Sequence, residues 1–139
     1  MQQALQQAEM AFAQGEVPIG AVVACNGRIV GRGHNATERL NDPTAHAEML
    51  AITAACESLG SKYLRECTLY VTIEPCSMCA GALRWAQLER LVFGAHEEKF
   101  GFSRFSEDIL HPKTEVAGGL LAAEARELMQ RFFAEKRRQ

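Results

Sequence analysis

Apolar residues recur every three or four positions in several stretches of the chain, which is the spacing of one face of an α-helix. Near the start this face consists of Leu5, Ala8 and Phe12, and the helix is expected to end near Gly15. The alanine-rich face that follows His46 is expected to end near Gly60 in the same way. The predicted helices cover residues 2–14, 46–60, 77–87 and 125–133.

Short apolar and β-branched runs separate these helices and predict strands. Residues 17–25 are almost continuously apolar, which is typical of a strand buried on both faces. Asn26-Gly27 is a favoured pair for a hairpin turn, so residues 28–33 should return antiparallel. Because helices precede the runs at 68–73 and 90–95, we expect parallel crossovers and an α/β layered sheet. The segment 96–119 has no clear period, so it is either functional or contains elements that the pattern does not reveal.

Composition narrows the class of protein. The chain has 139 residues, 47% of them hydrophobic, and no repeat or linker, so we predict a single domain over 1–139. Its longest apolar run, 19–25, is too short to cross a bilayer, and the start lacks the pattern of a secretory signal. We therefore expect a cytoplasmic enzyme or binding domain. A net charge of −2 excludes a globally basic nucleic-acid binder, although residues 126–139 carry five basic and two acidic side chains.

Two cysteines stand out from the other three. Cys76 and Cys79 lie at i and i+3 at a predicted helix start, where the helix dipole favours thiolates. Such a pair by itself fits a redox site, half of a structural zinc site or simple packing. The remaining cysteines lie in apolar surroundings and are expected to be reduced, buried small hydrophobes. These are Cys25, Cys56 and Cys67.

His46 and Glu48 change this interpretation. An imidazole and two thiolates make three ligands, as in catalytic zinc sites, and a nearby carboxylate can take protons from a zinc-bound water. Residues at i and i+2 of a regular helix point apart, so His46 and Glu48 share a site only if the helix begins at about His46. The alternatives are an ordinary helix start, or a structural zinc site with Cys67 or Cys56 as fourth ligand.

Through His46, Glu48, Cys76 and Cys79 the chain resembles the zinc-dependent nucleoside and nucleobase deaminases. These enzymes form the cytidine/deoxycytidylate deaminase superfamily. The signature is His-Ala-Glu at 46–48 followed by Pro-Cys-x-x-Cys at 75–79. Within the superfamily the chain is most similar to the bacterial tRNA-specific adenosine deaminases, from the first predicted helix to the last. The similarity is strongest in residues 15–22, 41–48 and 74–82.

The resemblance implies a role for each matching residue. His46, Cys76 and Cys79 would bind Zn²⁺, and Glu48 would shuttle protons. The substrate contacts that it implies are Asn35 against the target base, Val17 in the pocket wall, and Glu97 in place of an RNA-contacting aspartate. It also implies a three-layer α/β/α fold with a five-stranded mixed sheet, and a homodimer.

The implied reaction is hydrolytic deamination of adenosine to inosine at the wobble position of a tRNA anticodon stem-loop. Phe100, Phe102 and Phe105 alternate with Lys99 and Arg104, a pattern that suits stacked RNA bases, although each phenylalanine could equally pack within the protein. Trp85-Ala86-Gln87 is also similar to the guanine and cytosine deaminase branches. A free nucleobase or nucleoside deaminase is therefore the alternative.

Overall fold

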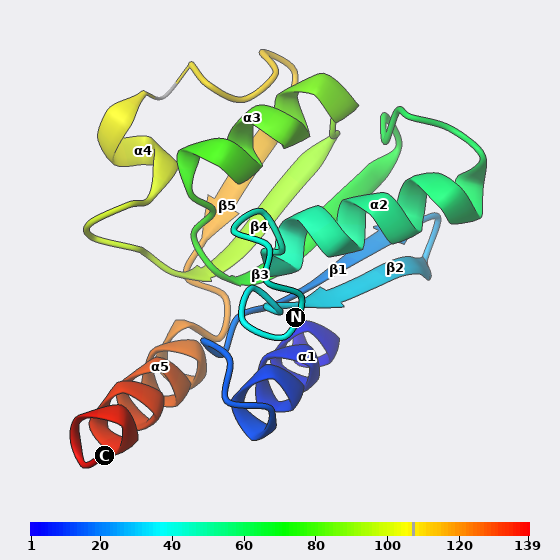
Figure 1. Cartoon of the computed structure of the whole chain (residues 1–139). Helices are drawn as coiled ribbons and strands as arrows, with labels where there is room; N and C mark the ends of the chain where they lie inside the picture. The colour runs from blue at the N-terminus through cyan, green and yellow to red at the C-terminus, as the bar shows by residue number, and fades with distance from the viewer. Residues whose placement is uncertain (107) are drawn as a thin grey trace.

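A five-stranded mixed sheet forms the middle of three layers in the computed structural model, which describes residues 1–106 and 108–139. Helices α2 and α3 cover one face of the sheet, and α1 and α5 cover the other (Figure 1). The strands are β1 (Gly20–Cys25), β2 (Arg28–His34), β3 (Cys67–Ile73), β4 (Arg90–Ala95) and β5 (Glu115–Gly118). The helices are α1 (Gln2–Ala13), α2 (Ala47–Leu59), α3 (Ser77–Ala86), α4 (Phe102–Phe105) and α5 (Ala122–Arg137).

The strand order is β2-β1-β3-β4-β5, which confirms the predicted fold class. Asn26 and Gly27 both adopt positive φ, as a tight hairpin turn requires, and β1 pairs antiparallel with β2. β3 pairs antiparallel with β1 and parallel with β4, which in turn is parallel to β5. Strand β1 starts at Gly20, three residues later than predicted, because Val17-Pro18-Ile19 connects α1 to the sheet outside the ladder.

Helix α2 lies unusually close to the sheet. Its buried face consists of Ala47, Ala51 and Ala55, and it crosses Gly31 and Gly33 of β2. A Cβ atom on Gly33 would lie 2.4 Å from the carbonyl oxygen of Ala47, so only glycine allows this approach. The contact fixes the first turn of α2, and therefore His46, relative to the sheet.

The segment without a clear period contains two short elements. Helix α4 has 4 residues and β5 has 4, and every residue of β5 is exposed. Neither is long enough to produce a helical or alternating apolar pattern, which is why the sequence did not reveal them. Glu107 lies outside the described residues.

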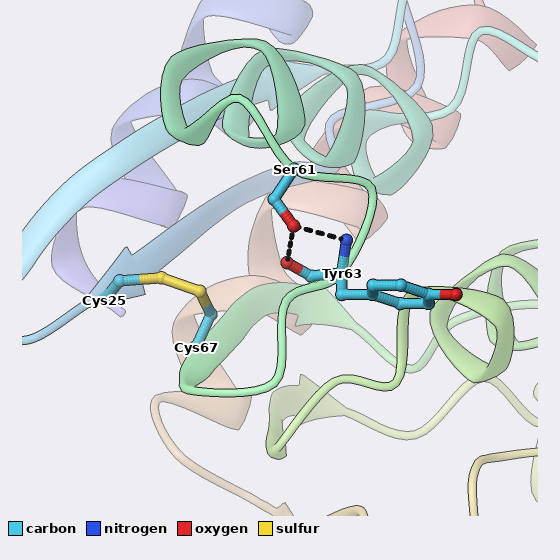
Figure 2. The surroundings of a disulfide bond; sticks show 4 residues. All are labelled: Cys25, Ser61, Tyr63 and Cys67. Carbon is cyan, nitrogen blue, oxygen red and sulfur yellow. Dashed lines mark hydrogen bonds between the residues drawn. A yellow bond between two sulfur atoms is a disulfide. The ribbon is translucent and has the colours of Figure 1, made fainter.

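Cys25 and Cys67 are buried as predicted, but the prediction that they are reduced is wrong, because these two cysteines form a disulfide (Figure 2). They are direct partners across the antiparallel β1–β3 pair, at the end of β1 and the start of β3, and their Cα atoms are 4.4 Å apart. Directly opposed positions at this separation lie within bonding reach, which is a matter of strand register and is not visible in the sequence. Beside the disulfide, Ser61 Oγ accepts from the Tyr63 N–H and donates to the Tyr63 carbonyl (Figure 2).

None of the helices in residues 1–106 and 108–139 has the length and apolar character needed to cross a membrane.

Candidate metal centre

The starts of α2 and α3 meet at the end of the sheet where β2 finishes at His34 and β3 finishes at Ile73. His46 is the N-cap of α2, with φ −76° and ψ 154°, and Cys76 is the N-cap of α3, with φ −72° and ψ 172°. Both are extended rather than helical, so neither side chain follows the direction of the helix that it precedes. The predicted condition on α2 is met: its helical residues begin at Ala47, and His46 and Glu48 contribute to one cavity.

Three ligand-type side chains converge there. His46 Nδ1 lies 3.6 Å from Cys76 Sγ and 3.5 Å from Cys79 Sγ. The three candidate ligand atoms all lie within 4.8 Å of one another, a grouping that can hold a metal ion. Cys67 is bonded to Cys25 and is not free to act as a fourth ligand, and no described residue besides these three joins the group.

Burial and hydrogen bonding shift the pKa values of the titratable groups at this site. Glu48 is buried, and this burial raises the pKa of its carboxyl to about 7. A hydrogen bond from Cys79, with another from His46, lowers the pKa of the Cys76 thiol to about 4. The pKa of Cys79 is raised, first by its hydrogen bond to Cys76 and then by burial. The pKa of His46 is raised chiefly by its contact with Cys76.

A cavity of about 650 Å³ opens beside these groups. One wall carries His46, Glu48 and Cys76. The opposite wall comes from the loop after β4 and from α5, and its members are His96, Glu97, Glu98, Lys99, Phe100, Arg126, Met129, Gln130 and Phe133. A buried carboxylate, a thiol and an imidazole thus share one cavity with basic, acidic and aromatic side chains.

The three predicted substrate contacts lie at different places. Glu97 lines the cavity, but its carboxylate accepts the backbone N–H groups of Lys99 at 3.3 Å and Phe100 at 2.6 Å, so it closes a turn of its own loop. Asn35 is buried, and its backbone N–H donates to the carbonyl of Ile19. Val17 is half-buried and accepts from the Ile19 N–H. Neither Asn35 nor Val17 is among the cavity-lining residues, whereas Ile19, which both contact through the backbone, is.

Sequence reasoning missed Glu74 and Phe133, and it placed Arg126 in the basic segment 126–139 without assigning it to the cavity. Glu74 is a buried carboxylate at the end of an apolar strand, directly before Pro75-Cys76, and that position was the available signal. Arg126 and Phe133 lie seven positions apart on α5, and the sequence does not show which face of this helix points to the cavity.

The comparisons with known proteins point to one family. The family model of the MafB19-like deaminases matches residues 1–137. A tRNA-specific adenosine deaminase of Agrobacterium fabrum (strain C58) is 44% identical over 142 residues, which cover 99% of this chain and 93% of that protein.

Two solved structures have the same fold. One comes from a study of A-to-I editing by tRNA:A34 deaminases at the wobble position of transfer RNA. It is 44% identical with a TM-score of 0.86, over 92% of this chain and 96% of the other. The second, a guanine deaminase from Nitrosomonas europaea, is 26% identical with a TM-score of 0.85, over 94% of this chain and 81% of the other.

Proposed function

The chain belongs to the MafB19-like deaminase family and to the tRNA-specific adenosine deaminases, and we propose that it converts adenosine to inosine at the wobble position of a tRNA anticodon loop. The observation that carries this proposal is the convergence of His46, Cys76 and Cys79 beside the buried carboxylate of Glu48. We propose that residues 1–139 act as one deaminase domain.

The donor set fits Zn²⁺. With Zn–S of about 2.3 Å and Zn–N of about 2.0–2.1 Å, tetrahedral geometry puts a sulfur and a nitrogen ligand about 3.6 Å apart. The His46 Nδ1 atom lies 3.6 Å and 3.5 Å from the two sulfurs, so the ligands need little movement to hold the ion. Zinc held by His46, Cys76 and Cys79 would supply the Lewis acidity that makes a water nucleophilic at neutral pH.

Glu48 has the protonation properties that the reaction requires. A carboxyl with a pKa of about 7 exchanges a proton readily at neutral pH, because both of its forms are populated. Glu48 takes a proton from the attacking water and delivers it to N1 of adenine while the water oxygen bonds to C6. It then takes the proton of the new hydroxyl and gives it to the amino group. The C6–N6 bond breaks, and ammonia and inosine result.

Several exposed side chains near the cavity suit an RNA substrate. Phe100 is 64% exposed and lines the cavity, and Phe105 is 61% exposed. Phe102 differs, since it is buried in the core and is unsuited to stacking on a base. Arg126 lines the cavity, and the basic end of α5 is further along the same helix. We propose that Phe100 stacks on a loop base and that α5 contacts phosphates.

The substrate contacts Asn35, Val17 and Glu97 are part of the same proposal. Asn35 has both a donor and an acceptor for a base edge, and together with Val17 it brackets the cavity residue Ile19 through backbone hydrogen bonds. Glu97 supports the proposal through its place in the cavity wall, where its carboxylate shapes the turn that presents Phe100.

A homodimer and a cytoplasmic location complete the proposal. The outer side of α3 exposes Trp85 (81%) and Met78 (37%), an apolar pair suited to an interface with a second copy. Analytical ultracentrifugation tests the dimer.

Disulfides such as Cys25–Cys67 are rare in the cytoplasm, so freshly purified protein should be compared by thiol titration with and without reductant. The oxidised, metal-free chain should show the thiols of Cys56, Cys76 and Cys79.

One assay tests the proposed reaction. Zinc-loaded protein is incubated with an anticodon stem-loop RNA bearing adenosine at the wobble position and, separately, with free adenosine, guanine and cytosine. Inosine is expected in the stem-loop, with much lower turnover of the small substrates. Preferred turnover of free guanine or cytosine would overturn the proposal in favour of a nucleobase deaminase.

A further inference from the structure

One wall of the cavity carries His46, Glu48 and Cys76 and is called the metal wall here. The carboxylate of Glu74 connects this wall to the loop after β4, which forms part of the opposite wall. Its side chain is 1% exposed, and it follows β3 two residues before Cys76. Oε1 accepts from His96 Nδ1 at 3.1 Å and from the Glu97 N–H at 3.2 Å. Oε2 accepts from the Ser103 N–H at 3.0 Å and from Ser103 Oγ at 2.6 Å. One buried group therefore holds both ends of the loop 96–103.

Backbone contacts also join the loop 96–103 to Pro75 and Cys76, directly after Glu74. The Phe102 N–H donates to the Pro75 carbonyl at 2.9 Å, and Cys76 forms an isolated antiparallel bridge with Gly101. A Cβ atom on Gly101 would lie 2.5 Å from Glu74 Cδ, so the loop packs directly on the carboxylate. The position of Phe100 in the cavity wall is thus fixed relative to Cys76.

We propose that Glu74 is a positioning residue, which sets the substrate-binding loop 96–103 in register with the metal ligand Cys76. This inference rests on the proposed function, because it assigns that loop to the RNA substrate. Glu74 is not one of the three candidate metal ligands, and it takes no part in the proposed proton transfers. It acts through the loop, and its loss should weaken substrate binding more than the chemical step.

Glu74→Gln is a sharp test because glutamine keeps the shape and loses an acceptor. Whichever way the amide is turned, its NH₂ group faces a backbone N–H, either that of Glu97 or that of Ser103. A backbone donor cannot reverse its role, so one end of the loop is released.

Glu16→Gln is the matched control. Glu16 is also buried, and its carboxylate accepts the backbone N–H groups of Glu38 at 3.1 Å and Arg39 at 2.8 Å. The substitution creates the same conflict of donors in another loop, one that does not line the cavity. It therefore reports what the loss of a buried carboxylate acceptor does to stability alone.

The experiment compares kcat, KM, zinc content and thermal midpoint of the wild type and both variants on the stem-loop RNA. For Glu74→Gln we expect KM to rise about 10-fold and kcat to fall less than about 3-fold, with zinc content unchanged. Glu16→Gln should lower the thermal midpoint without changing KM. Equal thermal losses with unchanged KM in both variants would reduce Glu74 to a structural role and overturn the proposal.

A double-mutant cycle and hydrogen exchange complete the test. If Glu74 acts through the loop, Phe100→Ala should raise KM less in the Glu74→Gln background than in the wild type, and additive effects would contradict the proposal. Amide exchange in 96–103 should accelerate about 10-fold or more in Glu74→Gln and not in Glu16→Gln. A wild type that deaminates only a free base overturns the proposed function instead, and the KM comparison is then made on that base.

Discussion

The two walls of the cavity are built in different ways. The metal wall consists of the first turns of α2 and α3. Both helices bury alanines, and Gly31 and Gly33 of β2 permit backbone contact between α2 and the sheet. The opposite wall consists of a loop and an exposed helix face, where Phe100 is 64% and Phe133 is 42% exposed. Apolar packing fixes the first wall, whereas hydrogen bonds to one carboxylate fix the loop of the second.

Under the proposed function, this difference separates the chemical step from substrate recognition. Proton transfer requires atoms that stay within a few tenths of an ångström of each other, and close-packed helix starts provide that. Recognition of a nucleic acid requires exposed aromatic and basic groups, which a packed core cannot present. Substitutions in the metal wall should therefore change turnover or metal binding, and substitutions in the opposite wall should change affinity.

The largest effect is expected for Glu48→Gln in the metal wall. Glutamine preserves the shape of the side chain but cannot cycle a proton, so kcat should fall by about 10²–10⁴-fold. Zinc content and thermal midpoint should stay close to those of the wild type, because Glu48 is not among the three ligand residues. Turnover assays and metal analysis on the same sample check this, and near-normal turnover would place the proton shuttle elsewhere.

Zinc affinity should weaken as the pH falls. At neutral pH the Cys76 thiol is already ionised, because its pKa is about 4, whereas the pKa of Cys79 is raised by its hydrogen bond to Cys76 and by burial, so this thiol keeps its proton. Zinc binding must displace that proton, so each unit of decreasing pH should lower the apparent affinity by about 10-fold. Competition with a chromophoric chelator at several pH values measures this slope.

Cys56→Ser is the control for the pH dependence of zinc affinity. Cys56 is a free cysteine at the far end of α2, outside the ligand group, so its loss should leave the pH dependence unchanged. A zinc affinity independent of pH in the wild type would contradict the assigned ligand set.

A pair of glycine substitutions tests the packing of the metal wall. Gly33→Ala places a Cβ 2.4 Å from a backbone oxygen of α2, so it should destabilise the protein by about 1–3 kcal/mol and lower zinc retention. Gly81→Ala, in the middle of α3, meets no atom within 4 Å and should stabilise by about 0.5–1 kcal/mol. Urea unfolding of the zinc-loaded proteins measures both, and equal effects would mean that α2 is not held by close approach.

The smallest effect is expected at the end of α5, on the recognition side. Truncation after Phe133 removes Lys136, Arg137 and Arg138, none of which forms an ion pair with a described residue. Each lost phosphate contact should flatten the logarithmic salt dependence of RNA binding by about 0.7, while zinc content stays the same. Binding titrations at several salt concentrations measure the slope, and an unchanged slope would show that the tail is only a solvated helix end.

The sequence by itself determined much of this protein. Helices α1, α2 and α3 and strands β2, β3 and β4 begin and end close to the predicted residues, because each has a clear apolar period or run and definite end signals such as Gly60. The spacing of His46, Glu48, Cys76 and Cys79 at two helix starts was enough to suggest a metal site, since ligand chemistry restricts the residue types so strongly.

The tertiary structure alone decided the rest. The bond between Cys25 and Cys67 depends on the register of β1 against β3, and the burial of Phe102 depends on how the loop after β4 folds onto α3. The role of Glu74 depends on four donors from residues more than 20 positions away. Such contacts join residues that are far apart in the sequence. The pattern of apolar and polar residues predicts local secondary structure, so it does not predict these contacts.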